Sequence, residues 1–165
     1  MNSVAPKSKS ESESESKPNR KLDVVIVGGG LAGGLTALRF SIAQPDLKIL
    51  LIERGKKIGS DRTWDFHDSD LPIESKSWLQ PLISASWPEH QVMFPKFSKT
   101  FNSAYHAIRP ADFHSFLRDR LGGRLRLNTE AETLTESTVQ LKGGDTIHAS
   151  LVLDARGLEG LPPDT

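Results

Sequence analysis

The glycine-rich segment at residues 28–33 constrains the fold of this chain more than any other feature. It follows the apolar, β-branched run of residues 22–27, and it precedes apolar residues that recur at helical spacing as far as Ile42. A second apolar run, residues 47–52, ends in Glu53. Strand, glycine turn, helix and strand in this order predict a right-handed βαβ unit and an α/β fold.

The glycines match the pattern Gly-x-Gly-x-x-Gly, with Gly28, Gly30 and Gly33 at its fixed positions. Between a strand and a helix, such glycines permit a tight turn, let the backbone approach a pyrophosphate, and allow close packing of helix on strand. Leu31 and Ala32 fall in the first turn of the helix, where free N–H groups attract phosphates. These five residues are predicted to bind a dinucleotide; a glycine turn that only packs is the alternative.

Glu53 is the candidate partner of the adenosine. At the end of the second strand its carboxylate can accept hydrogen bonds from both ribose hydroxyls, and it would repel a 2′-phosphate. This Rossmann-like fingerprint is shared by NAD and FAD sites, so it does not choose between them.

The end of the chain favours FAD over NAD. Residues 138–141 and 146–149 are predicted to pair as a hairpin, and residues 151–153 to form a last strand. Asp154-Ala155-Arg156-Gly157 follows. Many flavoproteins return through such a β-meander to a strand that ends beside the phosphate turn; a plain strand and turn is the alternative.

The middle of the chain is less regular. The spacing predicts a helix over residues 71–83, interrupted at Pro81, and a helix from Pro110 that ends at Gly122-Gly123. Strands are predicted over residues 90–94, 100–108 and 124–127.

Composition excludes several classes of function. The 165 residues include no cysteine, which removes disulfides and thiolate metal sites, and the five histidines show no metal-ligand spacing, so we expect no metal. Equal numbers of Lys+Arg and Asp+Glu, 21 each, argue against a nucleic-acid partner. Strand-length apolar runs and an N-terminus without a signal peptide lead us to expect a cytoplasmic protein.

Residues 1–21, rich in Ser and Glu, are predicted to be a disordered tail before an FAD-binding domain at 22–165.

From residue 22 to about 157 the sequence resembles the bacterial lycopene cyclases, which are FAD-dependent proteins with the glutathione-reductase-like fold. The most specific part of the resemblance is Thr63-Trp64-x-Phe66-His67. The glycine segment, Leu50-Leu51-Ile52-Glu53, Ile58-Gly59, Trp87-Pro88, Tyr105 with Ile108, and Leu153-Asp154-Ala155-Arg156-Gly157 also carry it. The chain departs from the family at Gly59-Ser60-Asp61-Arg62, where Gly-Gly-Asn-His is usual, and at Ala155, where glycine is common.

The resemblance implies an isomerase, an intramolecular lyase of carotenoid synthesis that closes rings at the ends of linear lycopene. An acid would protonate the terminal double bond, and reduced FAD would stabilise the cation, with NAD(P)H as the possible reductant. A lipid-soluble substrate implies peripheral contact with a membrane. Such cyclases are more than twice as long, so we expect an incomplete FAD/NAD(P)-binding fold, a fragment inactive alone, and catalytic residues outside it.

The resemblance also implies roles for single residues. Asp154 and Gly157 would lie near the ribityl and phosphate groups, and Arg109 would contact the cofactor, with a surface ion pair as the alternative. Trp64, Phe66 and His67 would border the flavin or the polyene, with ordinary packing as the alternative. Two other functions stay open: a different FAD-dependent oxidoreductase or monooxygenase, and a non-catalytic dinucleotide-binding module.

Overall fold

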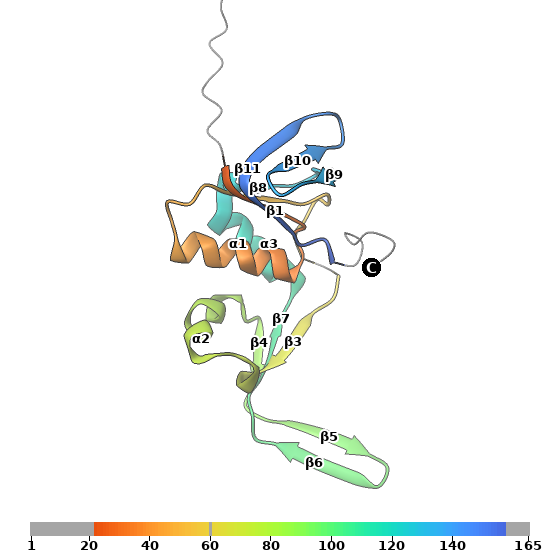
Figure 1. Ribbon diagram of the computed structural model, residues 1–165. Coiled ribbons are helices and arrows are strands. Elements are labelled where there is room, and N and C mark those ends of the chain that lie inside the picture. The colour runs from red at the N-terminus through yellow and green to blue at the C-terminus, as the bar shows by residue number, and fades with distance from the viewer. Residues whose placement is uncertain (1–21, 60, 158–165) are drawn as a thin grey trace, which may run out of the picture.

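The computed structural model describes residues 22–59 and 61–157 (Figure 1). The predicted tail at residues 1–21, and residues 158–165 of the predicted domain, lie outside the described residues. Six strands form the main sheet in the order β8-β2-β1-β11-β10-β9. Their bounds are β1 Leu22–Val27, β2 Ile49–Ile52, β8 Leu125–Arg126, β9 Ala131–Leu134, β10 Thr138–Leu141 and β11 Thr146–Asp154. The predicted strands over residues 47–52 and 124–127 are therefore present and shorter than expected.

Strand β1 is buried on both faces, which explains its uninterrupted apolar sequence. Val24 and Ile26 belong to a core beneath the helices, whereas Val25 and Val27 belong to a second core beneath the meander. Helix α1 (Leu31–Ala43) connects β1 to β2, and the two strands are parallel. The predicted βαβ unit is confirmed.

Strand β11 links the parallel strands to the meander. Its first half pairs antiparallel with β10, with Thr138 opposite His148, and its second half pairs parallel with β1, with Val27 opposite Asp154. The predicted meander is confirmed, with β9 as its third strand. The prediction of separate strands at 146–149 and 151–153 is wrong, because two different partners hold one continuous strand.

The middle segment forms two small sheets. Strand β7 (Tyr105–Ile108) pairs with β3 (Trp64–His67) and β4 (Ala85–Trp87), and β5 (His90–Phe94) pairs with β6 (Phe97–Phe101) as a hairpin that projects from the body (Figure 1). The prediction of one strand over residues 100–108 is wrong. This range holds the end of β6 and all of β7, which pair with different strands. The predicted helix at 71–83 is shorter: α2 spans Ile73–Leu79 and a 3-10 turn follows at Gln80–Leu82.

Helix α3 (Pro110–Leu121) packs beside α1 on one face of the parallel strands. It begins at Pro110, which tolerates the first helical turn because no N–H bond is required there, and Gly122 ends it with a φ of 53°. Its buried residues Phe113, Leu117 and Leu121 join the core of α1, β1 and β2.

Among the helices of residues 22–59 and 61–157, none is long and apolar enough to span a membrane.

Candidate dinucleotide-binding site

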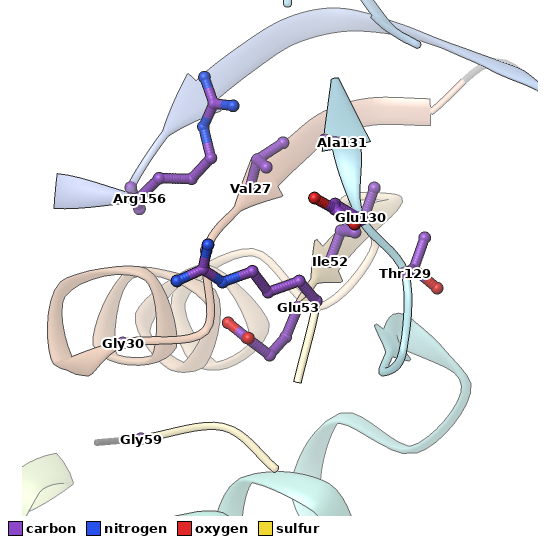
Figure 2. A pocket seen from close by; sticks show the side chains of 12 residues that line it. Val27, Gly30, Ile52, Glu53, Gly59, Thr129, Glu130, Ala131 and Arg156 are labelled. Carbon is purple, nitrogen blue, oxygen red and sulfur yellow. The ribbon is translucent and has the colours of Figure 1, made fainter. Parts of the chain in front are cut away.

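A cavity of about 630 Å³ lies beyond the carboxyl ends of β1 and β2 (Figure 2). Ligands of open α/β sheets bind at this edge of the sheet. The cavity is lined by Val27, Gly28, Gly30, Ile52, Glu53, Arg54, Gly59, Thr129, Glu130, Ala131, Ala155 and Arg156. Its volume lies within the range of small-molecule and cofactor pockets.

Close packing explains two of the three glycines of the fingerprint. Gly28 has a φ of 108°, and a Cβ there would lie 2.6 Å from the carbonyl oxygen of Ala155. A Cβ on Gly33 would lie within 1.9 Å of the carbonyl oxygen of Gly28. Both positions therefore need glycine so that β1, α1 and the end of β11 can approach one another.

Gly30 is not constrained by packing in this way. Among the described residues, no heavy atom outside Gly30 and its two chain neighbours lies within 4 Å of where its Cβ would be, and Gly30 lines the cavity. Gly30 is the N-cap of α1, no side chain caps that helix end, and the first turn carries no acidic residue. An open space beside a free helix N-terminus fits a phosphate group, because the N–H groups and the helix dipole favour an anion.

The carboxylate of Glu53 is held beneath the glycine turn by two backbone groups. Its Oε2 accepts a hydrogen bond from the Gly29 N–H at 2.6 Å, and its Oε1 accepts one from the Gly55 N–H at 2.7 Å. Figure 2 shows the carboxylate between the turn at Gly30 and Gly59. A carboxylate oxygen can accept more than one hydrogen bond, so both oxygens retain capacity for the two hydroxyls of a ribose.

The loop that carries Gly59 is attached to the glycine turn and to α3. The Gly59 N–H donates to the carbonyl oxygen of Gly29 at 2.6 Å, and the Ile58 N–H donates to Nδ1 of His114 at 3.3 Å. Burial, followed by the charges of Arg118 and Lys57, lowers the pKa of His114. Because Nδ1 accepts a hydrogen bond, the neutral imidazole is the form that holds this wall of the cavity.

The end of β11 brings a paired charge to the cavity. Arg156 donates from Nε and one terminal nitrogen to the two carboxylate oxygens of Asp154, at 2.9 and 2.7 Å. The Arg156 hydrogen bond lowers the pKa of Asp154, and the same bond raises the pKa of Arg156. Arg156 lines the cavity, but its guanidinium faces Asp154.

The structure brings some of the predicted site residues together and separates others. Gly28, Gly30 and Glu53 line the cavity, and Leu31, Ala32 and Gly33 form the adjoining first turn of α1. Asp154 and Gly157 flank the lining residues Ala155 and Arg156 without lining the cavity themselves.

Arg109 lies on the surface, at the start of α3. Its side chain is 64% exposed, and Nε donates to Asp112 at 2.8 Å, which is the ion pair that the sequence left as the alternative. The Arg109 bond, together with one from Ser84, lowers the pKa of Asp112, with Ser84 the larger influence.

The aromatic residues of β3 pack beside the site and do not line the cavity. The Trp64 ring meets Phe113 edge to face at 5.1 Å, and Phe66 meets His106 at 5.2 Å. His67 lies 5.0 Å from Tyr105. A Cβ on Gly59 would lie 3.2 Å from the Trp64 ring, so this ring supports the wall of the cavity from behind.

Several lining residues escaped the sequence interpretation. Arg54 directly follows the predicted Glu53, and Arg156 directly precedes the predicted Gly157. Their positions next to these residues could have indicated them. Thr129 and Glu130 come from the connection between β8 and β9, which backbone bonds attach to the end of β2: the Thr129 N–H donates to the carbonyl oxygen of Glu53 at 2.9 Å. No local pattern marks this connection, because only the sheet order places it here.

Within the described ranges 22–59 and 61–157, no group of three His, Cys, Asp or Glu side chains is arranged to hold a metal ion.

Comparison with known proteins connects this site to a family. The model of the family described as lycopene cyclase protein matches residues 23–165. A lycopene beta-cyclase of Pantoea ananas is 39% identical over 135 residues, which cover 82% of this chain and 35% of that protein. Lycopene beta-cyclases of Pseudescherichia vulneris and Paracoccus sp. (strain N81106 / MBIC 01143) are 37% and 34% identical, covering 82% and 83% of this chain and 35% of each relative. The chain thus spans about a third of the length of these curated relatives.

Solved structures share the fold at low sequence identity. The tetrameric form of 2-methyl-3-hydroxypyridine-5-carboxylic acid oxygenase has a TM-score of 0.63 and 19% identity, covering 81% of this chain and 38% of that one. The p-nitrophenol 4-monooxygenase PnpA of Pseudomonas putida DLL-E4 has a TM-score of 0.62 and 17% identity, covering 86% and 44%. These likenesses concern the fold, and they confirm the predicted Rossmann-like α/β class.

Proposed function

This chain belongs to the lycopene cyclase family, and we propose that it forms the FAD-binding part of a flavoprotein that cyclises the ends of linear lycopene. The family match supports the choice of substrate. The observation that carries the cofactor assignment is the Glu53 carboxylate, held by the N–H groups of Gly29 and Gly55 on the cavity wall beneath the glycine turn.

The residues around the cavity fit a dinucleotide. The backbone at Gly28 and Gly30, with the first turn of α1, would hold the pyrophosphate, and Glu53 would hold the adenosine ribose. The glycine at residue 30 leaves open space where a side chain would stand, which supports close approach by a ligand. FAD, when bound in reduced form, would supply an electron-rich ring system next to developing positive charge.

One feature supports FAD over a nicotinamide dinucleotide as the resident group. The meander returns β11 to the side of β1, and the Ala155 N–H donates to the carbonyl oxygen of Val27 at 2.7 Å. The carboxylate of Glu53 would repel the 2′-phosphate of NADP, which disfavours NADP but does not separate NAD from FAD. NAD(P)H would then act only as a reductant that visits the protein.

The proposed reaction is an isomerisation. A proton adds to the terminal double bond of lycopene, the neighbouring double bond attacks the tertiary cation to close a ring, and one proton leaves. One proton enters and one leaves, so no electrons are transferred overall. The step requires a positioned acid and surroundings that exclude water.

None of the described residues is assigned the role of this acid. We therefore propose that the 165 residues bind FAD but do not cyclise lycopene by themselves. Because lycopene dissolves in bilayers, the protein would work at a membrane surface, from the cytoplasmic side.

A chimera tests the proposed function. Residues 22–157 would replace the matching segment of the Pantoea ananas lycopene beta-cyclase, and the chimera would be produced in bacterial cells that accumulate lycopene. We expect cyclised carotenoids on chromatography and their loss in the Glu53→Gln chimera. Glu74→Gln, which changes an acidic residue of α2 outside the cavity, should leave the products unchanged.

The flavin content of the purified chimera separates misfolding from a wrong assignment. A chimera that holds one FAD per chain but leaves lycopene unconverted would contradict the cyclase assignment. Oxygen uptake that depends on an added substrate would instead favour the monooxygenase alternative.

A further inference from the structure

The β5–β6 hairpin has one apolar and one polar face. Residues opposite one another on paired strands share a face, and the pairs are His90 with Phe101, Val92 with Lys99, and Phe94 with Phe97. These six residues form the apolar face, apart from the charge of Lys99. The opposite face holds Met93 and three polar residues, Gln91, Ser98 and Thr100, and Gln91 donates to Ser98 at 2.9 Å.

The base of the hairpin is packed against the body of the protein. The His90 ring stacks on Phe101 at 4.9 Å with an angle of 3° between the planes. His90 also lies 4.8 Å from the His67 ring and 5.4 Å from the Tyr105 ring, so it joins the hairpin to β3 and β7. The base is therefore fixed by aromatic contacts.

The hairpin tip, residues 93–97, is exposed. Met93, Phe94 and Phe97 have exposed fractions of 71, 64 and 56%, and no residue of the hairpin belongs to either hydrophobic core of the described chain. Figure 1 shows the tip at the far end of the molecule from the six-stranded sheet. An isolated two-stranded ribbon is marginally stable in water, so large apolar side chains at its tip indicate a surface that something covers.

The charge of the hairpin favours a negatively charged partner. Between residues 90 and 101 the chain has Lys96 and Lys99 and no carboxylate, although the whole chain is neutral. Lys96 stands between the two exposed phenylalanines, and the Lys99 ammonium lies 4.6 Å from the centroid of the Phe101 ring. Lysine is depleted in the buried centres of protein interfaces. Aromatic side chains beside lysines instead match the boundary of an anionic bilayer, where rings enter the headgroup region and ammonium groups meet phosphates.

We propose that the hairpin tip is the surface through which this chain contacts an anionic lipid bilayer. Phe94 and Phe97 enter the interface, and Lys96 and Lys99 pair with lipid phosphates. The choice of a lipid surface rests in part on the proposed function, since a bilayer is where a carotenoid is dissolved.

Vesicle sedimentation with the full 165-residue chain tests this surface. We expect the chain to sediment with vesicles of phosphatidylcholine and phosphatidylglycerol at about 7:3, and much less with phosphatidylcholine alone. Phe94→Ser with Phe97→Ser should lower the partition coefficient by roughly tenfold or more, and Lys96→Gln and Lys99→Gln by roughly fivefold each at low salt. The control Ile73→Ser removes an apolar residue of α2 that is 77% exposed, and it should leave binding unchanged.

Because the chain has no cysteine, a single introduced cysteine can carry a polarity-sensitive dye. A dye at Phe94→Cys should shift to the blue with anionic vesicles, whereas a dye at Ile73→Cys should not. Absence of vesicle binding, or binding that the phenylalanine substitutions leave unchanged, would overturn the proposal. The proposal would also be overturned if the chain does not bind vesicles but forms a concentration-dependent dimer that the phenylalanine substitutions abolish.

FAD binding in solution, measured on the same variants, keeps the two proposals distinguishable. Vesicle binding without FAD binding would contradict the proposed function and leave the membrane surface standing. FAD binding without vesicle binding would contradict the membrane surface and leave the proposed function standing.

Discussion

Gly28 and Gly30 stand two residues apart in one turn, and the structure requires glycine at the first position but leaves room for a side chain at the second. At Gly28 a side chain would meet the backbone of Ala155, in a region of φ that favours glycine. At Gly30, with a φ of −67°, a side chain would meet only open space within the cavity. Folding thus explains the first glycine, and we propose that ligand access explains the second.

Alanine substitutions should separate these two roles. We expect Gly28→Ala to lower the free energy of unfolding by roughly 2 kcal/mol or more, because strain at positive φ adds to the clash with Ala155. Gly30→Ala should change stability by less than about 0.5 kcal/mol and weaken FAD binding. Urea denaturation and flavin titration measure the two effects. Equal losses of stability in both variants would contradict this division.

His114 makes the free energy of unfolding depend on pH. Burial lowers its pKa, so the unfolded chain binds a proton more readily than the folded chain. The stabilisation is fully present above the ordinary histidine pKa of about 6.5 and is lost as pH falls through the lower pKa of the folded protein.

A comparison with His114→Gln measures this dependence, because glutamine offers an acceptor that does not titrate in this range. As pH falls from about 7.5 to about 5, the free energy of unfolding of the native chain should fall more than that of the variant. Urea denaturation at a series of pH values gives both curves. Parallel curves would show that the histidine is not the titrating group.

At the scale of elements, helix α3 connects β3 to α1, the helix that follows the glycine turn. Phe113 is fully buried, contacts Trp64 of β3, and lies where a Cβ on Gly34 of α1 would come within 2.5 Å of its ring. The hairpin β5–β6, in contrast, has exposed phenylalanines at its tip.

Removing one ring from each element should give different results. Phe113→Ala should lower the free energy of unfolding by about 3–5 kcal/mol, the usual range for a buried phenylalanine. Phe97→Ala, at a side chain 56% exposed, should lower it by less than about 1 kcal/mol. Thermal or urea denaturation checks both values. A large loss at Phe97 would mean that the hairpin tip is needed for the fold.

The elements also show what local sequence can predict. The β1-α1-β2 unit was predictable because its strands are apolar on both faces and its helix has clear periodicity. Strands β3 and β4 were missed because they are short and hold polar residues, and their conformation depends on pairing with β7. The same cause divides the predicted strand at 100–108, since its two halves pair with different strands.

At the scale of the whole molecule, sheet order assembles the candidate site from distant segments. Gly28, Gly30 and Glu53 were predictable, because the fingerprint and the end of the second strand mark them. Thr129, which lies against Glu53 through a backbone hydrogen bond, was not, because β8 must first pair with β2. The site therefore combines a local motif with partners that only the completed sheet positions.

The central claim is that the glycine turn and Glu53 form an FAD site, and a titration of the purified chain with FAD tests it most directly. We predict binding of one FAD per chain, weaker binding of NADP, and roughly tenfold or greater loss of FAD affinity in Glu53→Gln, the usual size for a hydrogen bond to a charged group. Glu74→Gln should bind FAD as the native chain does. Absence of FAD binding, or equal affinity in Glu53→Gln and the native chain, would contradict the claim.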